Sequence, residues 1–257
     1  MSFKIATWNV NSLRVRLPHV LAWLEEHKPD VLALQETKLI DADFPLDSLK
    51  EAGYHACFSG QKTYNGMAIL SRTDCADTVT DIPGLVDPQR RFLAATIEGV
   101  RVINLYVPNG ESVVSDKYTY KLSWLEHLRL FLYEEQKKHQ SIIILGDFNI
   151  APEADDVHDP VAWEGKVLFS EKERNALRDL LAVGFVDSFR LHEQPEKSYS
   201  WWDYRMNAFK RNLGLRIDHI LVSHALTDKC VRCYIDKTPR ALERPSDHTP
   251  VVAEFNL

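Results

Sequence analysis

Short apolar runs of strand length, interrupted by a few helical patterns, are the feature that most constrains how this chain can fold. The runs cover residues 3–9, 30–36, 66–71, 92–99, 100–107, 141–149, 185–190, 199–205, 215–223 and 251–257. Helical patterns cover residues 17–24, 118–139 and 170–183. Because strand-like runs outnumber helical patterns, the sequence predicts an α/β fold in which two sheets pack on each other and helices lie outside.

Composition indicates a single domain over residues 1–257. The chain is 45% hydrophobic and 26% charged, with only 10 glycines and 12 prolines, so it can bury one large core and contains no stretch typical of a linker. The N-terminus has no charged-then-apolar leader, and no window approaches the roughly 18 uncharged residues that a membrane span needs. We expect a soluble, monomeric, cytoplasmic protein with no membrane partner.

The four cysteines do not suggest a metal site. Cys230 and Cys233 have the spacing of half a zinc site, but Cys57 and Cys75 lie far away in the sequence and no second pair completes four ligands. We expect inert thiols.

A net charge of −6 argues against a nucleic-acid partner, but binding of phosphate needs only a local positive field. Residues 204–217 contain no acidic residue and come shortly after Trp201 and Trp202. The basic residues of this segment are Arg205, Lys210, Arg211 and Arg216. Basic residues among aromatic ones suit a polyanion whose bases or sugars can stack, and a solvated basic face is the alternative.

Polar residues stand where four of the strand-like runs end. They are Asn9, Glu36, Tyr106, Asn109, Asp147 and Asn149. Strand ends that gather at one edge of a sheet are where α/β proteins place their functional sites. Carboxylate and amide oxygens are hard ligands, so this set suits Mg²⁺ or Mn²⁺ and not zinc.

Asp247 and His248 form an adjacent pair between two prolines, just ahead of the last apolar run. Such a pair is most often an ordinary loop feature. A functional interpretation is available, because hydrolysis of an anionic phosphodiester needs a cation or strong donor facing the phosphate, opposite a metal ion. His248 is a candidate for that donor.

Five motifs, in this order and at these separations, resemble one known family. They are TWNVNSLR (7–14), LALQETK (32–38), GDFNIAP (146–152), GLRIDHILVS (214–223) and PSDHTPV (245–251). The chain resembles the exonuclease III branch of the DNase I-like endonuclease/exonuclease/phosphatase superfamily, the magnesium-dependent AP endonucleases of base-excision repair. The resemblance implies a four-layered α/β sandwich with two mixed sheets. This chain differs from many members of the family at Ser12, where they have glycine, and we interpret the difference as a variation in a turn.

The resemblance implies a metal side of the site. Glu36 would hold Mg²⁺, with Mn²⁺ as a substitute, Asn9 would lie beside it, and Asp247 would contribute directly or through water.

The resemblance also implies a phosphate side. Asp147 would orient or deprotonate the attacking water, and Asn149 would hold the scissile phosphate or Asp147 itself. Tyr106 would contact a phosphate oxygen. Asp218 would fix the tautomer of His248 and raise its pKa. The identity of the general base stays open.

Substrate selection is implied to lie nearby, with Trp201, Leu215 and Ile217 as walls of a pocket for an extruded sugar that lacks its base. The expected substrate is double-stranded DNA with abasic sites or 3′ ends, cleaved 5′ to the abasic site or trimmed of nucleotides and blocking groups. Two alternatives are a phosphoesterase of the same fold that acts on a soluble phosphate ester, and a relative that binds DNA with weak activity. Residues 161–174 are the loop expected to decide between the nuclease activities.

Overall fold

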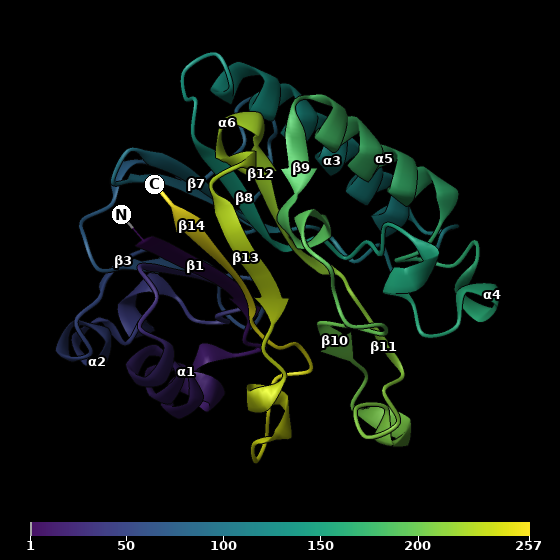
Figure 1. Cartoon of the computed structure of the whole chain (residues 1–257), viewed down its shortest axis with the longest axis horizontal. Helices are drawn as coiled ribbons and strands as arrows, with labels where there is room; N and C mark the ends of the chain where they lie inside the picture. Colours follow the sequence, from purple (N-terminus) through teal and green to yellow (C-terminus); the bar gives the residue numbers. More distant parts are fainter. Residues whose placement is uncertain (1) are drawn as a thin grey trace.

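The computed structural model describes residues 2–257 and contains two six-stranded mixed sheets that pack face to face (Figure 1). The first sheet has the strand order β13 (Cys230–Ile235), β14 (Val251–Asn256), β1 (Ser2–Asn9), β2 (Val31–Gln35), β4 (Met67–Ser71) and β3 (His55–Ser59). The second has the order β5 (Ala76–Val79), β6 (Phe92–Ile97), β7 (Val100–Tyr106), β8 (Ile142–Asp147), β12 (Asp218–Ser223) and β9 (Phe185–Asp187). The pairs β1 with β2 and β7 with β8 are parallel.

Helices cover the outer face of each sheet, which makes four layers. The α-helices are α1 (Leu13–His27), α2 (Leu46–Glu51), α3 (Asp116–Glu135), α4 (Pro160–Trp163), α5 (Glu171–Ala182) and α6 (His224–Thr227). The 3₁₀ helices are η1 (Asp41–Asp43), η2 (Ala154–Asp156), η3 (Ser188–Leu191), η4 (Arg205–Asn207) and η5 (Thr238–Ala241). The helices α1 and α2 pack on the first sheet, and α3 and α5 on the second (Figure 1). The predicted α/β sandwich is confirmed.

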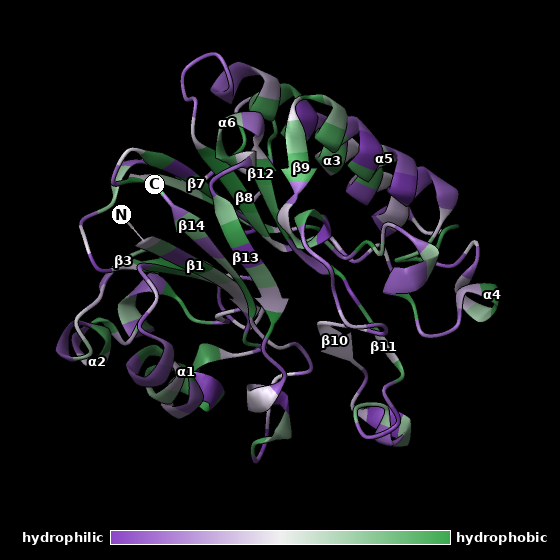
Figure 2. Ribbon diagram, in the orientation of Figure 1, coloured by the Kyte–Doolittle hydropathy of each residue, from purple (hydrophilic) through white to green (hydrophobic). Residues whose placement is uncertain are grey.

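The alternation of side chains along a strand explains how each sheet buries both faces. On β1, Phe3 and Ile5 point into the layer between the sheets, whereas Ala6 and Trp8 point towards α1. Figure 2 shows the apolar residues concentrated on the strands of both sheets. Among residues 2–257, no helix is both long and apolar enough to cross a membrane.

Strand register brings the polar strand ends to one edge of the sandwich. Because β7 and β8 are parallel, their last residues Tyr106 and Asp147 are direct neighbours. The antiparallel strand β12 begins opposite the same point, where Asp218 pairs with Asp147. The ends of β1 and β2 in the first sheet supply Asn9 and, one residue beyond the strand, Glu36.

A short ribbon of β10 (Trp201–Trp202) and β11 (Gly214–Leu215) stands beside this edge. It is joined to the loop before β14 by a bridge between Trp201 and His248. The strands expected over residues 199–205 and 215–223 are therefore shorter or divided, because the chain leaves the sheet between β11 and β12.

Candidate active site

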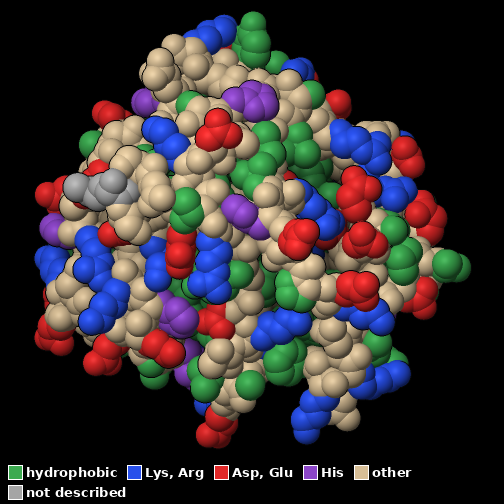
Figure 3. Space-filling view, viewed as in Figure 1, with side chains coloured by type: hydrophobic (Ala, Val, Ile, Leu, Met, Phe, Trp, Pro, Cys, Tyr) green, Lys and Arg blue, Asp and Glu red, His purple; other side chains and the backbone are tan. Residues whose placement is uncertain are grey.

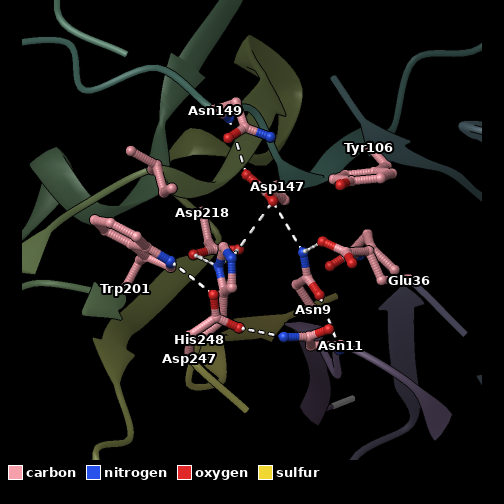
Figure 4. A network of polar contacts seen from close by, with 12 residues as sticks. Asn9, Asn11, Glu36, Tyr106, Asp147, Asn149, Trp201, Asp218, Asp247 and His248 are labelled. Carbon is pink, nitrogen blue, oxygen red and sulfur yellow. Dashed lines mark hydrogen bonds and ion pairs between the residues drawn. The ribbon is translucent and has the colours of Figure 1, made fainter. Parts of the chain in front are cut away.

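Three buried side chains form the centre of the candidate site (Figure 4). His248 Nδ1 lies 2.8 Å from Asp218 Oδ2, and His248 Nε2 lies 3.6 Å from Asp147 Oδ2. One potential ligand atom from each of the three residues lies within 4.8 Å of the others, so this group can hold a divalent metal ion. The contact between Asp218 and His248 that the sequence predicted is present.

Burial and mutual charge determine the protonation of this centre. Burial and, to a lesser extent, the neighbouring Asp218 and Glu36 carboxylates together raise the pKa of Asp147 to about 7, although the charge of His248 and the hydrogen bond from Asn9 lower it. Burial alone would lower the pKa of His248, but the Asp218 and Asp147 carboxylates outweigh it and raise that pKa to about 10. His248 is therefore an imidazolium at neutral pH and donates to Asp218 through Nδ1.

Asn9 connects this centre to Glu36. Its Nδ2 donates to Glu36 Oε1 at 2.8 Å and to Asp147 Oδ2 at 2.9 Å, while its Oδ1 accepts from the Asn11 backbone N–H at 3.0 Å. Lys38 Nζ lies 2.9 Å from the other oxygen of Glu36. Asn9 thus orients two carboxylates with its amide nitrogen.

Asp247 lies between Trp201 and Asn11 (Figure 4). Its Oδ1 accepts from Asn11 Nδ2 at 2.9 Å and its Oδ2 accepts from Trp201 Nε1 at 3.0 Å. Burial would raise the pKa of Asp247, but the His248 cation and these donors lower it, so the side chain is a carboxylate.

Tyr106 and Asn149 lie on the side of the site across from Asp247 (Figure 4). Burial raises the pKa of Tyr106 well above its ordinary value, and the neighbouring carboxylates of Glu36 and Asp147 add to the effect. The tyrosine is therefore neutral and can donate. Asn149 has a left-handed backbone with φ 51°, its Nδ2 donates to the Val107 carbonyl at 3.0 Å, and its backbone N–H donates to Asp147 Oδ1 at 2.9 Å.

Trp201, Leu215 and Ile217 belong to one apolar cluster, together with Leu168 and Phe169. Leu215 and Ile217 are only 0% and 1% exposed, so they support the cluster from within and offer no surface of their own. Trp201 is partly exposed and is the member that faces the site.

The basic segment divides into an exposed part and a buried one. Arg205, Lys210 and Arg211 are exposed, and Figure 3 shows Lys and Arg side chains at the tip of this part of the molecule. Arg216 is 1% exposed, with Nε 2.6 Å from Asp156 Oδ1 and Nη1 2.8 Å from Asp187 Oδ2. The prediction that Arg216 contacts DNA is wrong, because two carboxylates neutralise it inside the protein.

Several residues of the site were not singled out from the sequence. Lys38 and Asn11 connect Glu36 to Asp247 through a bond of 2.5 Å between Lys38 Nζ and Asn11 Oδ1. Ser200 Oγ donates to Asp218 Oδ2 at 2.6 Å. Lys38 and Asn11 lie within two of the motifs, so their position in the sequence was a usable signal, whereas Ser200 carried none.

Comparison with known proteins agrees with this geometry. The model of the endonuclease/exonuclease/phosphatase family matches residues 6–248. Exodeoxyribonuclease III of Haemophilus influenzae is 39% identical over 98% of this chain and 99% of its own length.

Two similar proteins have solved structures. The 3′ phosphatase NExo from Neisseria, bound to a product DNA hairpin, is 49% identical with a TM-score of 0.98, and the match covers 99% of this chain and all of that one. An AP endonuclease from Archaeoglobus fulgidus is 43% identical with a TM-score of 0.95 and the same coverage. The chain belongs to the endonuclease/exonuclease/phosphatase family, in its exonuclease III and AP endonuclease branch.

Proposed function

We propose that this protein is a metal-dependent hydrolase that cleaves phosphodiester bonds of double-stranded DNA in repair, at abasic sites or at 3′ ends. The observation that carries the proposal is the buried arrangement of Asp147, Asp218 and His248 beside Glu36. The 49% identical relative bound to a DNA product supports DNA as the substrate.

The residues of the phosphate side have complementary tasks. His248, held as an imidazolium by Asp218, faces the phosphate and donates to the oxygen on which negative charge develops. Asp147 has a pKa of about 7, which suits a group that accepts a proton from water at neutral pH. Asn149 and Tyr106 supply uncharged donors from the side of the site across from Asp247.

Mg²⁺ is the proposed metal, with Mn²⁺ as a substitute. A bound divalent ion would supply charge stabilisation to the phosphoryl oxygens. Glu36 is the residue that would hold the ion, with Asn9 orienting its carboxylate. Asp247 would contribute to the metal side directly or through water.

DNA would lie across the edge of the sandwich that carries these residues. Trp201 would contact an extruded sugar, with Leu215 and Ile217 behind it, and Arg205, Lys210 and Arg211 would contact the backbone. The monomeric state and the cytoplasmic location expected from the sequence remain predictions.

The test is a comparison of three substrates in the presence of Mg²⁺ and of EDTA. The substrates are a duplex with an abasic analogue, a duplex with a 3′ phosphate on a recessed end, and an inositol phosphate. We expect cleavage of one or both duplexes that stops in EDTA. Turnover of the inositol phosphate alone would contradict the proposal.

A further inference from the structure

A fully buried lysine lies directly behind the candidate active site. The side chain of Lys121, on α3, has no exposed surface, and its Nζ lies 2.5 Å from Oε1 of Glu173, on α5, which is equally buried. A buried ion pair of this kind is weak support for stability, because removing two charges from water costs much of what their attraction returns. Its position next to the site therefore calls for another explanation.

The ammonium group uses all three of its N–H bonds. Besides Glu173, it donates to the Asn149 carbonyl at 2.7 Å and to the Asn109 carbonyl at 3.1 Å. The two asparagines lie in the loops that follow β8 and β7, and Asn109 Nδ2 also donates to Asn149 Oδ1 at 3.1 Å. A single cation thus ties together two loops that carry the phosphate side of the site.

Glu173 extends the connection to a third segment. Its carboxylate accepts from the Leu168 backbone N–H at 3.0 Å, from the Ser170 N–H at 3.1 Å, and from the Ser170 hydroxyl. Leu168 has φ 76°, a conformation that a leucine rarely adopts, and its side chain packs in the same apolar cluster as Trp201. The ion pair therefore stabilises left-handed backbone at Leu168 and at Asn149, on two sides of the site.

We propose that Lys121 is a positioning residue that, together with Glu173, holds Asn149 in place for the reaction and holds the Leu168 segment against Trp201. The inference rests on the proposed function. Lys121 does not touch substrate and acts through Asn149. A displaced Asn149 weakens the transition state more than it weakens the binding of DNA, so kcat falls while KM changes little.

The test replaces both charges and uses a second buried ion pair as a matched control. Lys121→Met/Glu173→Gln removes the charges with little change of shape. The control variant is Arg101→Met/Glu135→Gln, which removes another buried ion pair, with Arg101 Nε 2.7 Å from Glu135 Oε2. Arg101 lies near the start of β7 and Glu135 at the end of α3, so this pair is at the ends of these elements that are remote from the site. We expect comparable shifts in Tm, but a fall in kcat of roughly 10- to 10²-fold only for the Lys121 pair, the scale of a small misplacement at a reacting centre.

Combination with Asn149→Ala separates positioning from general destabilisation. If Lys121 acts through Asn149, adding Lys121→Met/Glu173→Gln to Asn149→Ala causes no further loss of kcat. Multiplied losses, or a wild-type kcat in the pair variant, would overturn the inference. If the pair variant does not fold, Glu173→Gln alone is expected to give an intermediate kcat, and a wild-type kcat there is equally contrary. A folded wild-type protein that cleaves no DNA substrate would refute the proposed function instead.

Discussion

Replacing Asp218 and His248 separately and together tests whether the two side chains work as one unit. His248 Nδ1 lies 2.8 Å from Asp218 Oδ2, and both residues are buried. A hydrogen bond to a charged group contributes roughly 1.5–3 kcal/mol. Lost from the transition state, that corresponds to roughly a 10- to 150-fold lower rate, which is the loss we expect for Asp218→Ala.

His248→Ala removes the donor that we propose faces the phosphate, and we expect its kcat to fall by a factor on the order of 10²–10³. If Asp218 acts only through His248, Asp218→Ala/His248→Ala is no slower than His248→Ala. Independent action would multiply the two losses, to roughly 10³–10⁵ in total. The two hypotheses therefore differ by at least about tenfold in the double variant.

The assay is single-turnover cleavage of a duplex with an abasic analogue, at saturating enzyme and Mg²⁺. Ser200→Ala is the matched control, because Ser200 Oγ donates to the same Asp218 oxygen without touching His248. We expect a smaller loss for it than for Asp218→Ala. A double variant whose loss equals the product of the single losses would refute the reasoning, provided that circular dichroism shows all variants folded.

Three further outcomes are expected. Activity stops in EDTA and returns with Mg²⁺ or Mn²⁺, and full activity in EDTA would contradict the metal dependence. The Glu36→Ala variant is partly rescued by high Mg²⁺, which a titration of its rate against Mg²⁺ concentration measures. Trp201→Ala lowers the rate of cleavage at an abasic site by roughly 5- to 150-fold, which corresponds to one stacking contact of about 1–3 kcal/mol, and leaves the metal dependence unchanged. Equal rates for Trp201→Ala and the wild type would contradict the proposed pocket. A hydrogen bond from the Cys57 thiol lowers the pKa of Cys75, whereas burial raises the pKa of Cys230 to about 11, so Cys75 should be alkylated faster than Cys230 near neutral pH; mass spectrometry of alkylated peptides measures both rates, and equal rates would contradict the expectation.

The periodicity of apolar residues was sufficient to predict most of the strands and helices, because the pattern of buried residues along each element is a property of its own local sequence. The helical pattern predicted over residues 118–139 corresponds to α3 (Asp116–Glu135), where Leu125, Leu128 and Leu132 are buried. The strand predicted over residues 199–205 is limited to Trp201 and Trp202, since its partner β11 is only two residues long. Strand length there depends on pairing with a distant segment, which local sequence does not encode.

The site was predictable where a polar residue ends a strand, as at Asp147. Orientation was not predictable, because it depends on partners far away in the chain. Arg216 points inward because its guanidinium pairs with Asp156, 60 residues away in the chain. The basic segment 204–217 therefore contains one buried charge. Lys121 is similarly paired with Glu173, 52 residues away, and nothing in its own helix marks it as buried.

The two sheets each supply part of the site, in alternating order along the chain. Asn9 ends β1 and Glu36 follows β2 of the first sheet, Asp147 and Asp218 belong to the second sheet, and His248 lies in the loop that leads into β14 of the first. No single cut of the polypeptide can therefore yield a fragment that carries the whole centre. Two fragments produced by a cut in an exposed loop should each lack nuclease activity and regain it only when they reassociate. The fold is therefore suited to split-protein complementation.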